Sequence, residues 1–333
     1  MSVRTLARVA YSTASSTCEK VGFVGLGNMG RNMAANLLKR GFDIVAYDRN
    51  EQALAGMDTE GGSEVRFASS PADLVRTPGL TAVFTMLPSS AHVREVYTGP
   101  EGFLSAAASD IAPTLFVDCS TTGPECAEEL AGLVEGGACG AGATFVDAPV
   151  SGGVPGASAA TLTFMVGART PAAFERAKVK LSVMGKNVTH CGDVGAGQST
   201  KLCNNLVLGI SMAAVAESIA LGQSLGLCPK MLSDVFNTSS ARCWSSDTYN
   251  PCPGVMAAVP SAREYDGGFA TDLMCKDLRM ARDASEGKAG GGAHGGGLRL
   301  GREALGLYEA MQADGRGAKD FSSIYRYIYK GKE

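Results

Sequence analysis

The stretch VGFVGLGNMG, residues 21–30, decides the fold of this chain. Its first half is a short apolar run, which is typical of a buried strand. Its second half places Gly25, Gly27 and Gly30 in the spacing G-x-G-x-x-G. Methionine and leucine then recur at helical intervals up to Gly41, which predicts a helix closed by a C-terminal glycine. Strand, glycine turn and helix in this order predict the start of a Rossmann-type dinucleotide-binding unit.

The chemistry expected of this unit is the binding of NAD. Glycines let the backbone approach a pyrophosphate, and the helix N-terminus offers unpaired N–H groups. The next apolar run ends at Asp48, whose carboxylate can accept hydrogen bonds from both hydroxyls of the adenine ribose. A 2′-phosphate would meet that carboxylate as a like charge, so we predict NAD rather than NADP, although Arg49 could offset part of the repulsion. The predicted cofactor-binding residues here are Gly25, Gly27, Asn28, Met29, Gly30 and Asp48.

Alternation of strand and helix signals continues for some 170 residues. Apolar runs at residues 80–87, 114–119, 144–150 and 162–166, with helical patterns between them, predict an α/β fold with a doubly wound, largely parallel sheet. After Cys191 strand signals nearly disappear and long helical patterns take over. We therefore predict a Rossmann-type NAD-binding domain over residues 20–194. An all-α C-terminal domain for substrate binding and oligomerisation should follow over residues 195–333, in a homo-oligomer (dimer or tetramer).

Composition excludes several classes of function. The chain has 333 residues with 30 basic and 33 acidic side chains, a net charge of −3, which disfavours a nucleic-acid partner. The longest apolar stretch, residues 206–216, is shorter than the roughly 20 residues that a membrane span requires, so we expect no membrane partner. Three isolated histidines and ten scattered cysteines without a C-x-x-C pair predict no metal site and reduced thiols.

Two segments are expected to lie outside the packed domains. Residues 1–18 contain no acidic residue, carry Arg4 and Arg8 and are rich in serine and threonine, which is typical of a transit peptide. We predict a leader over residues 1–19 and the mitochondrial matrix as destination, with plastid, cytoplasm or a tail without function as alternatives. Residues 287–297, GKAGGGAHGGG, predict a mobile surface loop between helices.

Further motifs follow the first: TMLPSS, DCSTTGP, VDAPVSGGVPGASAATLTFMVG, GAGQSTKLCNN and GGFATDLMCKDL. On these motifs the chain resembles the β-hydroxyacid dehydrogenase family from residue 21 to about residue 330. The segment SSARCWSSDTYNPCPGVM, residues 239–256, is similar to that of members acting on 3-hydroxyisobutyrate. This resemblance implies NAD-dependent oxidation of 3-hydroxyisobutyrate to methylmalonate semialdehyde in valine catabolism.

Two alternatives stay open at this point. A related reductase of glyoxylate, succinic semialdehyde or tartronate semialdehyde would share every motif except the segment around residues 242–244, and would usually use NADP. A scaffold that uses the fold for protein contacts would belong to a different class. The lysine and asparagine retained in GAGQSTKLCNN argue against the scaffold.

The resemblance also implies roles for individual residues. Lys201 is the implied catalytic lysine, and Asn205, one helical turn on, is implied to act with it and to help hold the substrate. The residues implied to bind the substrate carboxylate are Ser151, Gly152 and Gly153. Those implied to line the nicotinamide side of the cofactor are Leu87, Pro88, Thr121 and, from the second domain, Lys276. His92 stands where members often carry an asparagine, so that cofactor contact differs here.

The reaction itself agrees with a lysine acid/base. Oxidation of a primary alcohol removes a hydride from carbon and a proton from the hydroxyl group. Because no motif contains a histidine, a lysine is the natural proton acceptor, provided that burial lowers its pKa from about 10.4. Lys201 and Asn205 lie at i and i+4, so both can point into one cleft.

Overall fold

The computed structural model describes residues 18–53, 63–139, 142–287 and 297–329. The predicted leader over residues 1–19 lies outside this range except for its last two residues. The glycine-rich segment lies outside it except for its two end residues. Both predictions therefore concern parts of the chain that the structure leaves undescribed.

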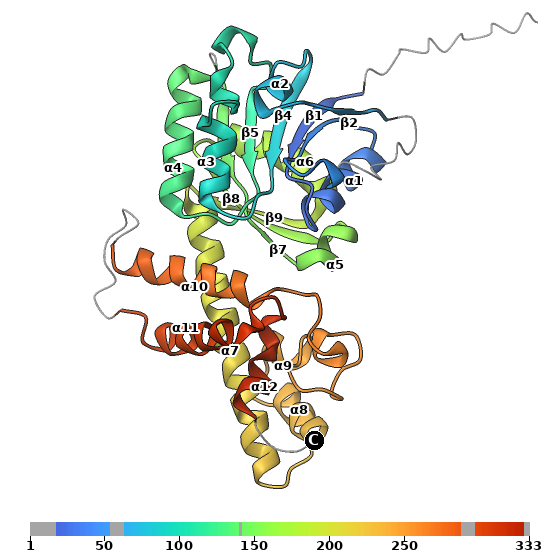
Figure 1. The fold of residues 1–333 in the computed structure, drawn as a ribbon, viewed down its shortest axis with the longest axis vertical. Helices are drawn as coiled ribbons and strands as arrows, with labels where there is room; N and C mark the ends of the chain where they lie inside the picture. The colour runs from blue at the N-terminus through green and yellow to red at the C-terminus, as the bar shows by residue number, and fades with distance from the viewer. Residues whose placement is uncertain (1–17, 54–62, 140–141, 288–296, 330–333) are drawn as a thin grey trace, which may run out of the picture.

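The first half of the chain forms one sheet (Figure 1). Its strands are β1 (Lys20–Val24), β2 (Asp43–Tyr47), β3 (Val65–Phe67), β4 (Leu80–Thr85), β5 (Leu115–Asp118), β6 (Thr144–Asp147), β7 (Val150–Ser151), β8 (Leu162–Ala168) and β9 (Gly185–Gly192). They lie in the order β3-β2-β1-β4-β5-β6-β8-β7, with β9 beside β8. Neighbours from β3 to β6 are parallel. In a sheet of this order, dinucleotides bind where the order reverses, between β1 and β4.

Helices cover both faces of the sheet. They are α1 (Gly30–Lys39), α2 (Pro71–Val75), α3 (Ser90–Thr98), α4 (Pro124–Leu133), α5 (Gly153–Ser158) and α6 (Pro171–Met184). One face packs on Leu37 of α1 and Leu181 of α6, and the other on Tyr97 of α3 and Leu130 of α4. Gly41 adopts φ +91° just after α1, as expected of a C-terminal glycine. The predicted doubly wound α/β fold is thus confirmed.

The far edge of the sheet differs from the predicted pattern. The apolar run 144–150 is two strands, because the chain turns at Pro149 between β6 and β7. Strand β8 runs antiparallel to both of these strands. Strand β9 was not predicted from the sequence. It lies at the edge beside β8 and carries mostly exposed or half-buried residues, so it lacks the apolar run by which the other strands were found.

The second half of the chain is helical. Its helices are α7 (Ala196–Ser224), α8 (Pro229–Thr238), α9 (Trp244–Asp247), α10 (Thr271–Ser285), α11 (Arg299–Met311) and α12 (Ile324–Ile328). Helix α7 starts against the sheet and runs through the whole second domain (Figure 1). Met212 and Ile219 of α7 share a core with Met274 of α10, Tyr308 of α11 and Tyr325 of α12.

Helix α7 is longer and more apolar than the stretch 206–216 suggested. With 29 residues and a mean hydropathy of 1.6 in its most apolar window, it could cross a membrane by length and composition alone. The expectation that no segment is long enough was therefore wrong for α7. Half of that window is buried inside the protein, where α7 forms the core of the all-α domain.

Candidate active site

The glycine turn between β1 and α1 combines tight packing with an open surface. A Cβ atom on Gly25 would overlap the carbonyl oxygen of Met86, and one on Gly30 would overlap the carbonyl oxygen of Gly25. Gly25 also adopts φ +94°, which favours glycine. Gly27 is exposed and has no atom within 4 Å of its Cβ position. Contacts within the protein therefore require glycine at positions 25 and 30, while Gly27 leaves its backbone open to a pyrophosphate.

Asp48 lies directly against this turn. Its Oδ2 accepts a hydrogen bond from the Leu26 N–H (2.6 Å), and its Oδ1 accepts one from the Asn50 N–H (2.8 Å). Arg49 is exposed. Of the other two residues predicted in this part of the site, Asn28 is exposed and Met29 packs against the core. The residues present fit the pyrophosphate and ribose of a dinucleotide.

The loops after β4 and β5 are joined by a buried carboxylate. Asp118 accepts hydrogen bonds on Oδ1 from the Thr85 hydroxyl (2.7 Å) and the Ser120 N–H (3.1 Å). The Ser120 Oγ in turn accepts a hydrogen bond from the Leu87 N–H (2.9 Å). Burial raises the pKa of Asp118 to about 6, against the opposing effect of these hydrogen bonds. The backbone of Leu87 is therefore held in place by Asp118 and Ser120 of the motif DCSTTGP, to which the sequence assigned no role.

Lys276 of α10 reaches from the second domain to both loops. Its Nζ donates hydrogen bonds to the carbonyl oxygens of Pro88 (3.2 Å) and Thr121 (3.0 Å). The structure thereby brings Pro88, Thr121 and Lys276 together, with Leu87 next to them in the chain. These contacts connect α10 with the loops that follow two adjacent strands of the sheet.

Lys201 is buried on α7. Only 7% of its surface is exposed, and desolvation by burial lowers the pKa of its ammonium group. The carboxylate of Asp277 opposes this shift and the charge of Lys276 adds to it. A lysine in this environment loses its proton more easily than one in water.

Asn205 and Asp277 connect this lysine helix to α10. The Asn205 Nδ2 donates a hydrogen bond to the Asp277 Oδ2 (2.5 Å), and the Asp277 Oδ1 lies 3.4 Å from the Lys276 Nζ. Lys201, Asn205 and Lys276 therefore form one cluster around a buried carboxylate. Asp277 was missed in the sequence, although it directly follows Lys276 in GGFATDLMCKDL.

The start of α7 is fixed to the sheet by Asp147 and Gln198, which lie in motifs that the sequence shows but were assigned no role from it. Asp147, at the end of β6, accepts hydrogen bonds from the N–H groups of Gly195 (2.8 Å) and Gln198 (2.9 Å). Burial raises the pKa of Asp147 to about 6, against these hydrogen bonds. The only available signals were the position of Asp147 at a strand end and the polar Gln198 in GAGQSTKLCNN.

The turn of Ser151, Gly152 and Gly153 joins the end of β7 to the start of α5. Gly152 and Gly153 adopt φ +129° and +61°, and both are exposed. Among the residues that the structure describes, no hydrogen bond joins this turn to Lys201 or Asn205. The structure therefore gives the turn an open backbone and leaves its role in binding a carboxylate as a prediction.

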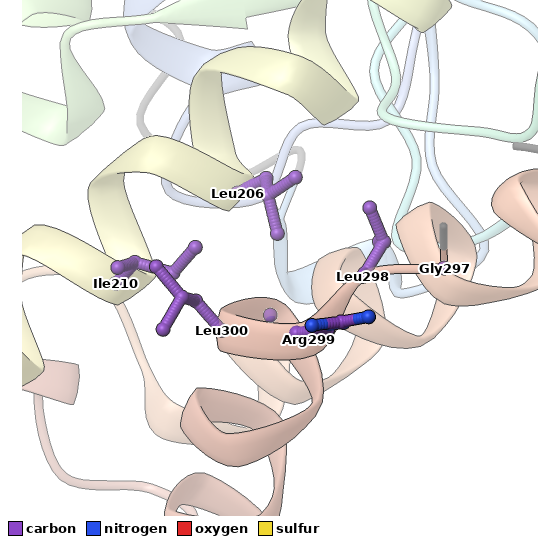
Figure 2. A pocket seen from close by; sticks show the side chains of 7 residues that line it. Leu206, Ile210, Gly297, Leu298, Arg299 and Leu300 are labelled. Carbon is purple, nitrogen blue, oxygen red and sulfur yellow. The ribbon is translucent and has the colours of Figure 1, made fainter. Parts of the chain in front are cut away.

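An apolar groove lies elsewhere on the all-α domain (Figure 2). It has a volume of about 380 Å³ and is bordered by Leu206 and Ile210 of α7 and by the start of α11 around Leu298 and Leu300. None of the predicted site residues lines it. The His92 Nδ1 lies 2.8 Å from the Oγ of Ser89, the residue after Pro88. No group of three or more potential metal ligands occurs among the described residues.

Comparison with known proteins gives matches over nearly the whole chain. A family model described as the NAD binding domain of 6-phosphogluconate dehydrogenase matches residues 20–192. A second, described as NAD-binding of NADP-dependent 3-hydroxyisobutyrate dehydrogenase, matches residues 195–328. The mitochondrial 3-hydroxyisobutyrate dehydrogenase of Bos taurus is 45% identical over 327 residues, 98% of this chain and 91% of the relative. A probable enzyme of the same name from Dictyostelium discoideum is 45% identical over 97% of this chain and 94% of the relative.

A solved structure shares the fold. The 3-hydroxyisobutyrate dehydrogenase of Mycobacterium tuberculosis, described with L-serine, matches with a TM-score of 0.80 and 35% identity, covering 93% of this chain and 99% of that chain. The site combines an open glycine turn with a buried lysine near Asp277 and Lys276, and Lys276 in turn contacts two loops of the first domain. Such a site can hold a dinucleotide and move a proton beside it.

Proposed function

This chain belongs to the 3-hydroxyisobutyrate dehydrogenase family, and we propose that Lys201 is the acid/base of its reaction. As a member it is an NAD(P)-dependent oxidoreductase that oxidises 3-hydroxyisobutyrate to methylmalonate semialdehyde in valine catabolism. The curated relatives carry this name, so a glyoxylate, succinic semialdehyde or tartronate semialdehyde reductase is not favoured.

The observation that carries the proposed mechanism is the burial of Lys201 beside Asp277. When bound, the nicotinamide ring of the cofactor supplies the hydride acceptor. Burial lowers the pKa of Lys201, so its neutral amine becomes available to take the hydroxyl proton of the substrate. The negative charge of the Asp277 carboxylate stabilises the ammonium group that results.

Asn205 is proposed to orient the substrate. An asparagine amide has two N–H donors, and one of them is used by the Asp277 Oδ2. The second remains available to a substrate oxygen, with the amide plane fixed by Asp277. Lys276 is proposed to close the other side of the site, because it holds the loops of Pro88 and Thr121 in place.

The turn at residues 151–153 is proposed to bind the substrate carboxylate. The two glycines adopt positive φ and expose backbone, and consecutive N–H groups of that kind form a concave site for an anion. A carboxylate held here would fix one end of a 3-hydroxy acid, while Lys201 acts on the hydroxyl group at the other end.

We propose NAD as the preferred cofactor. Asp48 is fixed against the glycine turn by two backbone N–H groups and cannot easily move away from a 2′-phosphate. Arg49 is exposed beside it and is proposed to contribute less. The protein is mitochondrial, as the relatives from Bos taurus and Dictyostelium discoideum are named, and we propose the matrix as its compartment.

We also propose that the chain forms a homo-oligomer through the all-α domain. Val207 and Leu221 of α7 and Leu225, the residue that follows this helix, are 60–69% exposed. Their spacings of 14 and 18 residues place them within about 40° of one another around the helix. Met231 and Val235 of α8 are also exposed and lie one helical turn apart. An apolar stripe of this length on a surface is typical of an interface.

A Leu221→Lys, Leu225→Lys double variant tests this proposal. It should shift the protein to a smaller species in sedimentation velocity.

The function is tested by assaying the purified protein with NAD and NADP against a panel of 3-hydroxy acids and, in the reverse direction, semialdehydes. We expect 3-hydroxyisobutyrate with NAD to give the highest kcat/KM. A higher kcat/KM for reduction of glyoxylate, succinic semialdehyde or tartronate semialdehyde with NADPH would contradict the proposal.

A further inference from the structure

Gln198 of α7 is fully buried and lies one helical turn before Lys201. Its side-chain amide spans the loop after β5. The Oε1 accepts a hydrogen bond from the Thr122 N–H (3.0 Å), and the Nε2 donates one to the Ser120 carbonyl oxygen (2.9 Å). These two backbone groups flank Thr121, so the amide holds the loop on both sides of that residue.

The main chain of the same glutamine is fixed as well. The Asp147 Oδ2 accepts the Gln198 N–H, and its Oδ1 accepts the Gly195 N–H. A Cβ atom on Gly197 would overlap the Met165 carbonyl oxygen, so the first turn of α7 rests directly on β8. The helix can therefore neither rotate nor slide at this point without breaking buried hydrogen bonds.

From this geometry we propose that Gln198 is a positioning residue, which sets the distance between the amine of Lys201 and the Ser120–Thr122 loop. The inference rests on the proposed function, in which that loop lines the nicotinamide side of the site. Loss of the amide would leave α7 fixed through Asp147 but would release the Ser120–Thr122 loop from the helix. The lysine would then meet the substrate hydroxyl in poorer geometry, although every catalytic group remained present.

The side chain required is specific. A single planar amide offers one acceptor and one donor at the separation that Thr122 N–H and Ser120 C=O demand. Asparagine is one methylene shorter and cannot reach the same two groups from the same helix position. Methionine fills a similar volume without forming either hydrogen bond.

The test compares Gln198→Met with Tyr308→Phe in the full-length protein. Tyr308 is also buried and donates one hydrogen bond to α7, to the Gly209 carbonyl oxygen (3.1 Å), but among the described residues no hydrogen bond joins it to Lys201, Asn205 or Asp277. For Gln198→Met we expect kcat to fall about 10- to 100-fold, the loss typical of a misplacement near 1 Å. The calorimetric Kd for NAD and KM should change little. For Tyr308→Phe we expect lower thermal stability with kcat unchanged.

Two readouts separate positioning from simple destabilisation. The primary deuterium isotope effect on kcat, with substrate labelled at the carbinol carbon, should rise in Gln198→Met because hydride transfer becomes rate-limiting. Hydrogen exchange of the Thr122 amide, measured without cofactor, should accelerate in the same variant. An unchanged kcat and isotope effect in folded Gln198→Met, with wild-type protein active, would overturn the inference. Inactive wild-type protein would instead overturn the proposed function.

A second variant covers the case in which Gln198→Met does not fold. Gln198→Glu keeps the acceptor for the Thr122 N–H and loses the neutral donor to the Ser120 carbonyl oxygen, so kcat should fall and the isotope effect should rise here too. In the wild-type protein the Thr122 amide should exchange far more slowly than an exposed amide of the same domain. Fast exchange of that amide in the wild type would contradict the two hydrogen bonds by which Gln198 holds the loop, whether or not either variant folds.

Discussion

The glycine turn after β1 and the first turns of α7, which we propose to serve one active site, are built in opposite ways. The turn works through the absence of side chains: Gly25 and Gly30 allow backbone to touch backbone, and Gly27 leaves an open surface. The start of α7 works through buried polar side chains with distant partners, such as Gln198 with Ser120 and Asn205 with Asp277. In the glycine turn, steric contact restricts which residues are accepted. At the start of α7, the restriction comes from desolvation and from the need for hydrogen bonds. Substitutions in the two regions should therefore fail differently.

The largest effect is expected at Lys201. Lys201→Ala should lower kcat by about 10²–10⁴-fold, because the proton acceptor is lost. The Kd for NAD, measured by calorimetry, should stay nearly unchanged. Lys201→Arg serves as the matched variant, since it keeps the positive charge but cannot act as a base. If Lys201→Arg kept more than about a tenth of the wild-type kcat, a loss below the usual range for acid–base groups, the assigned role would be wrong.

The glycine turn should separate stability from binding. Gly30→Ala places a methyl group on the Gly25 carbonyl oxygen and should cost about 1–3 kcal/mol in the free energy of unfolding, as overpacking does. Gly27→Ala meets no atom within 4 Å. It should leave stability within about 1 kcal/mol while raising the Kd for NAD about tenfold or more. Denaturant unfolding and calorimetry on both variants check this, and equal losses of stability would contradict it.

Asp48 adds a charge to the glycine turn, against which it is held by a hydrogen bond from the Leu26 N–H. We expect the wild-type protein to prefer NAD by about 30- to 150-fold in kcat/KM, equivalent to roughly 2–3 kcal/mol. Asp48→Ala should remove most of this discrimination, whereas Arg49→Ala should leave it in place. A wild-type preference for NADP, lost in Arg49→Ala, would show that the arginine governs the ribose site.

A smaller effect is expected in the pH dependence of stability. Burial raises the pKa of Asp147 to about 6, above the value near 4 in an unfolded chain. The folded protein then binds a proton that the unfolded protein releases, so this group makes stability fall as pH rises from about 4 to 6. Its contribution is at most of the order of 2–3 kcal/mol. In melting curves, Asp147→Asn should remove this part of the pH dependence of stability. If the melting temperature changed with pH identically in both proteins, the contribution of Asp147 would be excluded.

The two regions also differ in how far the sequence predicts them. The glycine turn, the second strand and Asp48 are contiguous, so spacing alone predicted the dinucleotide-binding fold that the structure shows. The polar cluster on α7 joins residues separated by 72 to 78 positions, as in Asn205 with Asp277 and Gln198 with Ser120. No local pattern contains such pairs. Lys201 and Asn205 were found through family resemblance, while the residues that hold them were not.

The central claim is that the chemistry depends on a lysine whose pKa is lowered by burial, so that its neutral amine is present to accept a proton, and the pH dependence of kcat tests it most directly. Lys201 must be neutral to accept the hydroxyl proton, and desolvation lowers its pKa, with Asp277 opposing and Lys276 reinforcing the shift. In the oxidation direction kcat should therefore rise from neutral pH and level off below the ordinary lysine pKa near 10.4. The same inflection should be absent from the residual activity of Lys201→Ala. A flat profile of the chemical step from pH 7 to 10, or an unchanged inflection in the variant, would contradict the account.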